Sequence, residues 1–221
     1  MLFEKCNKMI EWKTSKNLIS FEESEDLMNN RLDKILCKKE KELIWFLEHE
    51  SFYTFGKSAN KKDLIDPFVL PCHEVKRGGS YTYHGPGQRV VYLMLNLKNY
   101  GSDVRRFVWM LEEWVIKTLA YFKIFGKRIK GKVGVWLDEE IHENHLSPIP
   151  RKISAVGLRL KRWISYYGIS INVNPDLDKY KGIIACGNKG FGVTSLHNEG
   201  VFVSLEEFDF ILKKNFHTVF L

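Results

Sequence analysis

Positions 77–88 of the chain read Arg77-Gly78-Gly79-Ser80-Tyr81-Thr82-Tyr83-His84-Gly85-Pro86-Gly87-Gln88, and the apolar run Val90 to Leu97 follows almost at once. A loop so rich in glycine and proline gains little from burying side chains. Glycine lets the backbone approach another group closely, because it lacks a Cβ and tolerates positive φ. The stretch therefore predicts a close-fitting substrate loop that leads into a buried central strand.

A second glycine-rich stretch contains the thiol of Cys186, among Gly182, Gly187, Gly190 and Gly192. A lone cysteine is ordinarily a small buried hydrophobe, but flanking glycines are of little use in a core strand. Cysteine is the side chain that supplies a sulfur nucleophile for thioester exchange, and it needs a base or a cation nearby to ionise at neutral pH. Cys186 is therefore a candidate nucleophile of an acyl transferase.

Lys152 opens an expected strand whose next residues include Ser154, Ala155 and Gly157. A lysine at the start of a strand is ordinarily solvated, but these small residues would let a ligand chain lie against the strand. Lys152 could take the proton of the cysteine or stabilise the thiolate as an ammonium. The sequence leaves both roles open, because a coupled pair titrates together.

Three other features carry weaker signals. His84, inside the glycine loop, fits a structural role as well as a catalytic one. His142 and His145 lie three residues apart without a convincing third ligand, so no metal site is expected. Arg77-Gly78-Gly79 could cradle a phosphate, although it does not match a P-loop.

The composition of the 221 residues, 44% hydrophobic and 28% charged, is that of an ordinary globular protein, and we expect one domain over residues 1–221. The first residues do not resemble a signal peptide, and no apolar run is long enough to span a membrane. Cys6, Cys37 and Cys72 show no paired spacing, which favours free thiols and a cytoplasmic location. The net charge of +7 favours an acidic partner. The basic residues are not interleaved with aromatic ones, so nucleic acid is not an expected partner.

The hydrophobic pattern predicts an α+β fold with a mixed β-sheet core flanked by helices. Helices are expected over 22–41, after a cap at Ser102, and from a capping box of Ser204 and Glu207 to about Asn215. Two short strands are expected within 42–55. Further strands are expected over 90–97, 128–136, 153–160 and 163–174, with loops at 77–88 and 138–150 and a turn or short helix over 175–181.

These motifs together resemble the lipoyl(octanoyl) transferases of the biotin/lipoate protein ligase superfamily. The resemblance runs from about residue 26 to 212. It rests on the glycine loop, on Lys152-Ile153-x-Ala155-x-Gly157, on Asn172-Val173-Asn174-Pro175, and on Cys186-Gly187 followed by Gly192-Val193-Thr194-Ser195. It implies a biotin/lipoate protein ligase-like fold and an octanoyltransferase that needs no cofactor and no metal ion.

The family moves an octanoyl group from acyl carrier protein to a lysine of lipoyl domains, in 2-oxoacid dehydrogenases and in the glycine-cleavage carrier protein. By this resemblance Cys186 would carry the acyl-thioester and Lys152 would lower its pKa. The substrate groove would comprise Arg77 to His84, Ser154 to Val156, and Tyr167, Gly168 and Ile169. Acyl carrier proteins and lipoyl domains are typically acidic, which would suit the basic chain. A monomer is the expected state.

The sequence departs from the family pattern at Tyr167, where histidine is usual, and at Ala185, where proline is common. The loop 138–150 also looks longer than usual. Two other functions stay open. An ATP-dependent lipoate or biotin ligase would adenylate a free acid on the same fold, without a catalytic cysteine. A basic nucleic-acid-binding protein would need no chemistry at all.

Overall fold

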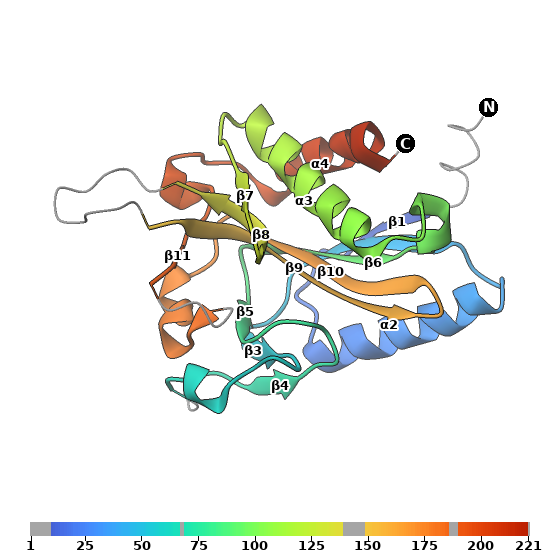
Figure 1. The fold of residues 1–221 in the computed structure, drawn as a ribbon, viewed down its shortest axis with the longest axis horizontal. Helices are drawn as coiled ribbons and strands as arrows, with labels where there is room; N and C mark the ends of the chain where they lie inside the picture. Colours follow the sequence, from blue (N-terminus) through green and yellow to red (C-terminus); the bar gives the residue numbers. More distant parts are fainter. Residues whose placement is uncertain (1–9, 67–68, 139–148, 186–189, 221) are drawn as a thin grey trace.

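The computed structural model describes residues 10–66, 69–138, 149–185 and 190–220 (Figure 1). Its helices are α2 (Phe21–Leu36), α3 (Val104–Tyr121) and α4 (Leu205–Phe220), and short 3₁₀ turns cover Lys61–Asp63, Leu97–Tyr100, Leu177–Gly182 and His197–Glu199. The strands are β1 (Ile10–Thr14), β2 (Glu42–Leu47), β3 (Phe52–Phe55), β4 (Cys72–Glu74), β5 (Thr82–His84), β6 (Gln88–Met94), β7 (Lys127–Ile129), β8 (Lys132–Leu137), β9 (Arg151–Lys161), β10 (Ile164–Asn172) and β11 (Gly192–Val193).

The strands form two sheets. The large mixed sheet has the order β1-β2-β6-β10-β9-β8-β7, and β11 pairs with β9 outside this path. β6 lies between β2 and β10, with Val91 opposite both Phe46 and Ile169. The small sheet has the order β4-β3-β5. The run after the glycine loop is thus a central strand, as its continuous apolar character predicts.

Helices α3 and α4 cover one face of the large sheet (Figure 1). Alternate strand residues such as Phe46, Val91 and Ile171 pack there against Phe107 and Trp114 of α3. The Trp114 indole donates to the Leu212 carbonyl oxygen at 2.6 Å and joins the two helices. This face is an apolar core between the large sheet and the two helices.

Helix α2 covers part of the opposite face. Met28 and Leu32 pack there against Trp45, Tyr92 and neighbouring strand residues, which alternate with those of the first face. The small sheet lies beside α2 on the same side of the large sheet (Figure 1). The space between the small sheet and the strands β9 and β10 holds the candidate site.

Most of the expected elements are confirmed, including the α+β class, the helix after residue 20 and the capping box, in which Glu207 N lies 3.2 Å from Ser204 Oγ. Others were wrong in their bounds. Asp103, rather than Ser102, caps α3, because its carboxylate accepts from the amides of Arg105 and Arg106. The strand expected over 128–136 is a hairpin of β7 and β8 turned at Gly131, which has a φ of +78°.

Three further expectations need correction. Trp163 belongs to the turn before β10, because Arg162 and Trp163 have φ values of +51° and +71°, as a two-residue hairpin turn of type I′ requires. Helix α4 continues past Asn215 to Phe220, which packs on Trp114 and Phe216. The glycine loop contains a short strand, β5, which pairs with β3.

Candidate active site

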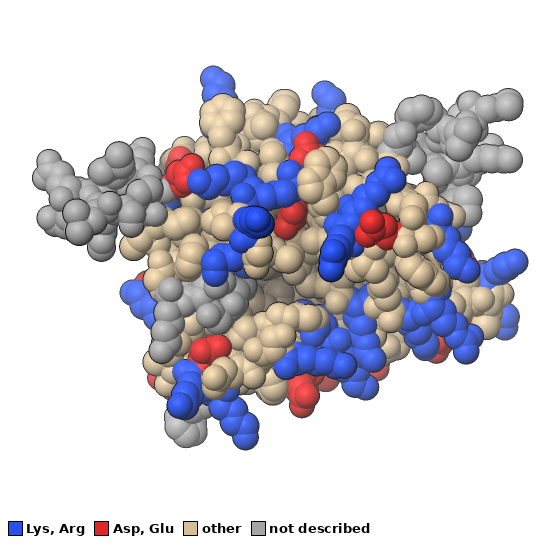
Figure 2. Space-filling view, in the orientation of Figure 1, with Lys and Arg blue, Asp and Glu red and all other residues tan. Residues whose placement is uncertain are grey.

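A cavity of about 360 Å³ lies between the glycine loop, β6 and the strands β9 and β10. It opens to the surface as the hollow visible in Figure 2, which has Lys and Arg side chains on both sides. Its volume falls in the range of roughly 300–1,000 Å³ of small-molecule sites. The described residues that line it are Phe21, Thr54, Val75, Arg77, Gly78, Gly79, Ser80, Thr82, His84, Val90, Tyr92, Gly131, Lys132, Val133, Lys152, Ala155, Val156, Gly157, Leu158, Tyr167, Gly168, Ile169 and Ser170.

The cavity runs along the paired strands β9 and β10. The register places Ser170 opposite Ala155, Gly168 opposite Gly157 and Tyr167 opposite Leu158. Gly157 leaves room for the Arg77 side chain beside this wall, because a Cβ at position 157 would come within 2.9 Å of that side chain. Three of the described lining side chains are lysine or arginine (Arg77, Lys132 and Lys152), and none is acidic. Much of the remaining lining is glycine or apolar, so the cavity suits an elongated, largely apolar ligand.

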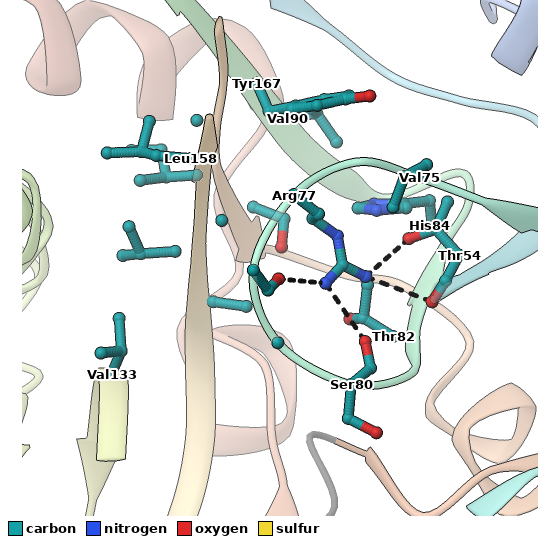
Figure 3. Close-up of a pocket in the computed structure, with 18 of the residues that line it drawn as sticks. Thr54, Val75, Arg77, Ser80, Thr82, His84, Val90, Val133, Leu158 and Tyr167 are labelled. Atoms are coloured by element: carbon teal, nitrogen blue, oxygen red, sulfur yellow. Dashed lines mark hydrogen bonds between the residues drawn. The ribbon is translucent and has the colours of Figure 1, made fainter. Parts of the chain in front are cut away.

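Arg77 fixes the shape of the glycine loop (Figure 3). Its Nη1 donates to the carbonyl oxygens of Gly78 at 2.8 Å and Ser80 at 3.1 Å. Its Nη2 donates to the hydroxyl of Thr54 at 2.8 Å and to the Thr54 carbonyl oxygen at 3.2 Å. One planar guanidinium thus ties the loop to β3, a geometry that a lysine cannot reproduce.

His84 lies at the base of the cavity in a buried polar network. Its Nδ1 is 2.7 Å from Gln88 Oε1, and the Gln88 amide nitrogen is 2.9 Å from Asn172 Oδ1 and 3.2 Å from the Tyr83 carbonyl oxygen. Because those two neighbours accept, the Gln88 oxygen faces His84, and Nδ1 of the imidazole donates. Burial lowers the pKa of His84 to about 3, so the ring is neutral.

Lys152 is held at one end of the cavity and is 9% exposed. Its Nζ donates to the Val133 carbonyl oxygen at 3.2 Å and lies 4.4 Å from the centre of the Trp136 ring. Gly134 leaves room for it, because a Cβ there would come within 3.3 Å of the lysine Cε. A buried ammonium held by a carbonyl and an aromatic ring is positioned to stabilise a nearby anion.

A second, much smaller cavity adjoins the first beside Lys152. The two share Thr82, Lys152, Ala155 and Ser170 as lining residues, and Ala185 lines the smaller one. Ala185 directly precedes Cys186 in the sequence. The structure therefore brings Lys152 and the residue before Cys186 to one cavity, whereas Cys186 itself lies outside the described residues.

Tyr167 lies at the other end of the cavity, and its backbone is unusual. It has a φ of +60° inside β10, where a residue with a Cβ is rarely found. Its ring stacks on that of Tyr166 at 5.0 Å, and burial together with the nearby Glu25 carboxyl of α2 raises the pKa of its hydroxyl. Burial raises the pKa of Glu25 above its usual value.

The structure brings most of the expected groove residues to the large cavity. Ser154 lines the small cavity rather than the large one. Tyr81 and Tyr83 line neither of these two, because their rings pack in the core of the small sheet with Tyr53 and Ile183. Cys6 and the pair His142 and His145 lie outside the described residues, as does most of the loop 138–150. Within the described ranges no three His, Cys, Asp or Glu side chains are grouped to hold a metal ion.

Sequence reasoning did not place several of the lining residues in the site, among them Phe21 of α2, Val75 after β4, Tyr92 of β6 and Val133 of β8. None of these four belongs to a motif named in the sequence analysis. Only Tyr92 carried a local signal, as a polar group within an apolar strand. Among the described helices, none has the length and apolar character needed to cross a membrane.

Comparison with known proteins supports the resemblance to the lipoyl(octanoyl) transferases. The lipoyl protein ligase A/B catalytic domain model matches residues 22–217. An octanoyltransferase of Bartonella tribocorum is 46% identical over 217 residues, which cover 97% of this chain and 88% of that protein. An octanoyltransferase of Cereibacter sphaeroides is 46% identical over 209 residues, covering 94% and 96% of the two chains.

Solved structures show the same fold at low identity. A bipartite lipoate protein ligase of Thermoplasma acidophilum is 15% identical with a TM-score of 0.65, covering 96% of this chain and 84% of its own. A biotin protein ligase of Aquifex aeolicus is 16% identical with a TM-score of 0.54, covering 96% of this chain and 70% of its own. The biotin/lipoate protein ligase-like fold is thus confirmed. The chain belongs to the octanoyltransferases of the lipoyl protein ligase A/B catalytic-domain family.

Proposed function

We propose that the protein transfers an octanoyl group from octanoyl-acyl carrier protein to a lysine of a lipoyl domain, through a thioester on Cys186. The arrangement of Lys152 carries this proposal. Its side chain is buried at the junction of the two cavities, and Ala185, next to Cys186 in the chain, lines the smaller of them. The large cavity provides space for an apolar acyl chain that leads away from this point.

The reaction has two steps. The Cys186 thiolate attacks the carbonyl carbon of the carrier thioester, and the carrier thiol leaves and takes up a proton. The amine of the target lysine then attacks the acyl-enzyme, forms the amide, loses a proton and releases the Cys186 thiolate. Backbone N–H groups of the glycine loop or of Cys186-Gly187 would stabilise the oxyanion of each step, a contribution of about 2.7–4 kcal/mol per donor.

Lys152 would act on the first step by favouring the thiolate. An opposite charge within about 4–6 Å lowers a pKa by about one to three units. The carbonyl oxygen of Val133 and the ring of Trp136 hold the Lys152 Nζ at this place. The second possibility, in which Lys152 takes the thiol proton, uses the same position and differs in the protonation state at rest.

The partners would be acidic proteins. The chain carries a net charge of +7, and Lys and Arg side chains flank the mouth of the cavity (Figure 2). Complementary charge raises the rate of encounter more than it raises affinity. The transfer rate at low carrier concentration should therefore fall as salt is added. We propose a cytoplasmic monomer that acts on two carriers in turn.

The proposal is tested by intact mass measurement after mixing the protein with octanoyl-acyl carrier protein. We expect a gain of one octanoyl group in the unmodified protein and none in Cys186→Ala. An adduct in both proteins would show that Cys186 is not the nucleophile. No adduct in either, with a carrier shown to be acylated, would overturn the transferase mechanism.

An ATP-dependent ligase is the alternative, because solved ligases share the fold. It would adenylate a free acid and would exchange pyrophosphate into ATP in the presence of lipoate or octanoate. We expect no such exchange. Exchange that persists in Cys186→Ala would favour the ligase.

A further inference from the structure

Among the lining residues of β10, Tyr167 lies farthest along the strand from Ser170, where the two cavities meet, and it has an unusual backbone conformation. We propose that Tyr167, held by the rings of Tyr166 and Tyr92, is the end wall of the cavity and sets the longest acyl chain that the protein accepts. This inference rests on the proposed function in one respect, namely that the cavity holds the acyl group.

The pairing of β9 and β10 gives the length of the cavity that is available to the acyl group. The two cavities meet at Ala155 and Ser170, which are paired, and the large cavity ends at Leu158 and Tyr167, which are also paired. Three residue steps separate these pairs, or about 10 Å at 3.3 Å per residue. That is close to the length of an extended eight-carbon acyl chain. None of residues 159–166, all of them described, lines the cavity.

The conformation of Tyr167 is what brings its ring to the wall. Ile169 and Ile171 of β10 belong to the core under α3 and α4, and strict alternation would direct Tyr167 to the same face. Instead Tyr167 belongs to the cluster under α2, together with its neighbour Tyr166. The φ of +60°, which is strained for a residue that has a Cβ, turns the ring across the sheet. Strain of this kind is retained where the surrounding contacts impose it.

Those contacts brace the ring from several sides. The ring lies 5.0 Å from that of Tyr166 and 6.2 Å from that of Tyr92. The Tyr92 hydroxyl is in turn held by His49 Nε2 at 2.8 Å. Tyr167 is 5% exposed, so the wall is packed rather than free to swing into solvent.

The side chains that line the cavity before Tyr167 are apolar, so each methylene buried against them should increase the binding affinity. Val75, Val90 and Leu158 contribute side chains to it (Figure 3). Burial of one CH₂ is worth about 0.8 kcal/mol, which corresponds to about a fourfold gain in affinity. That gain should continue up to octanoate and stop where the chain meets Tyr167.

The probes are the free acids hexanoate, octanoate, decanoate and dodecanoate, whose binding is measured by titration calorimetry. For the unmodified protein we expect affinity to rise up to octanoate and then to fall. In Tyr167→Gly, which tolerates the positive φ, we expect decanoate to bind about tenfold more tightly than octanoate. Trp163→Gly is the matched control: it also replaces an aromatic residue that has a positive φ, in the turn before β10, by glycine, lies outside the lining, and should leave the order of affinities unchanged.

Two further variants keep the test decisive if Tyr167→Gly does not fold. Tyr167→Leu should shift the optimum towards decanoate by a smaller factor, and Tyr167→Phe should keep the original order because it keeps the ring. An unchanged order in Tyr167→Leu, or a shift in Trp163→Gly as large as that in Tyr167→Gly, would overturn the inference. So would an unmodified protein that binds none of the four acids.

This experiment is separate from the test of the proposed function. Binding of free acids needs neither Cys186 nor a carrier protein. A shifted order of affinities without an octanoyl adduct on Cys186 would support the wall and refute the thioester mechanism. An adduct on Cys186 with no shift in Tyr167→Gly would do the reverse.

Discussion

The ammonium of Lys152 lies 4.4 Å from the centre of the Trp136 ring, and the two residues are paired across strands β8 and β9. β9 gains an extra residue at this point, because the register to β8 shifts between Val135 and Trp136. The irregularity allows Lys152 to share the cavity with Ala155, three positions along the strand. The lysine is therefore placed by the sheet itself rather than by a mobile loop.

Replacement of Lys152 by methionine should raise the pKa of the Cys186 thiol by about one to three units, because it removes the nearby positive charge. The measurement is the rate of iodoacetamide alkylation of the Cys186 peptide as a function of pH, followed by mass spectrometry. Lys161→Met is the control, since Lys161 lies on the same strand but is exposed and paired with Asp33 at 2.7 Å. A thiol pKa that stays constant while octanoyl transfer is lost would instead assign Lys152 the role of proton acceptor.

Replacement of Arg77 by lysine should destabilise the glycine loop. Four acceptors contact the guanidinium, and a single ammonium cannot reach them all. We expect the free energy of unfolding to fall by about 2–3 kcal/mol. Amide hydrogen exchange at Ser80 should also become faster. Lys76→Gln is the control, because Lys76 is the exposed neighbour. Unchanged exchange at the loop in Arg77→Lys would show that the glycines hold their shape without it.

The sequence predicted the elements better than it predicted the site. The patterns of α2, β6 and α4 follow from hydrophobic period and capping, which are local. The cavity depends on contacts between distant segments, such as Arg77 with Thr54 and Gln88 with Asn172. The position of Tyr167 contradicts strand alternation, because its φ is fixed by packing against α2. The motifs indicated segments that line the cavity, whereas the shape of its walls depends on tertiary packing.

Glu42 should make the protein less stable as the pH rises. The carboxyl is 6% exposed and accepts from Asn99 at 2.8 Å, and burial raises its pKa from 4.5 to about 7. A raised pKa means that the folded state holds the proton more tightly than the unfolded state does. The contribution of Glu42 to the free energy of unfolding is therefore fully present below pH 4.5. It falls by roughly 2–3 kcal/mol as the pH rises to about 7. The amide oxygen of Glu42→Gln can still accept from Asn99. In urea unfolding at pH 5 and pH 8, the variant should have a higher free energy of unfolding than the unmodified protein at pH 8 only. An equal effect at both values would exclude a titration.

His84 should act in the opposite direction. Burial lowers its pKa from 6.5 to about 3, so the unfolded chain binds a proton that the folded chain does not. The contribution of His84 is full above pH 6.5 and falls as the pH drops towards 3. The loss at pH 5 should be about 2 kcal/mol. We expect His84→Gln to reduce the difference in unfolding free energy between pH 8 and pH 5 by about that amount, whatever its effect at pH 8. His197→Gln is the control, because that imidazole belongs to the 3₁₀ turn His197–Glu199 and is only partly buried. A pH 8 to pH 5 difference in His84→Gln equal to that of the unmodified protein would mean that His84 is not the neutral ring that its burial indicates.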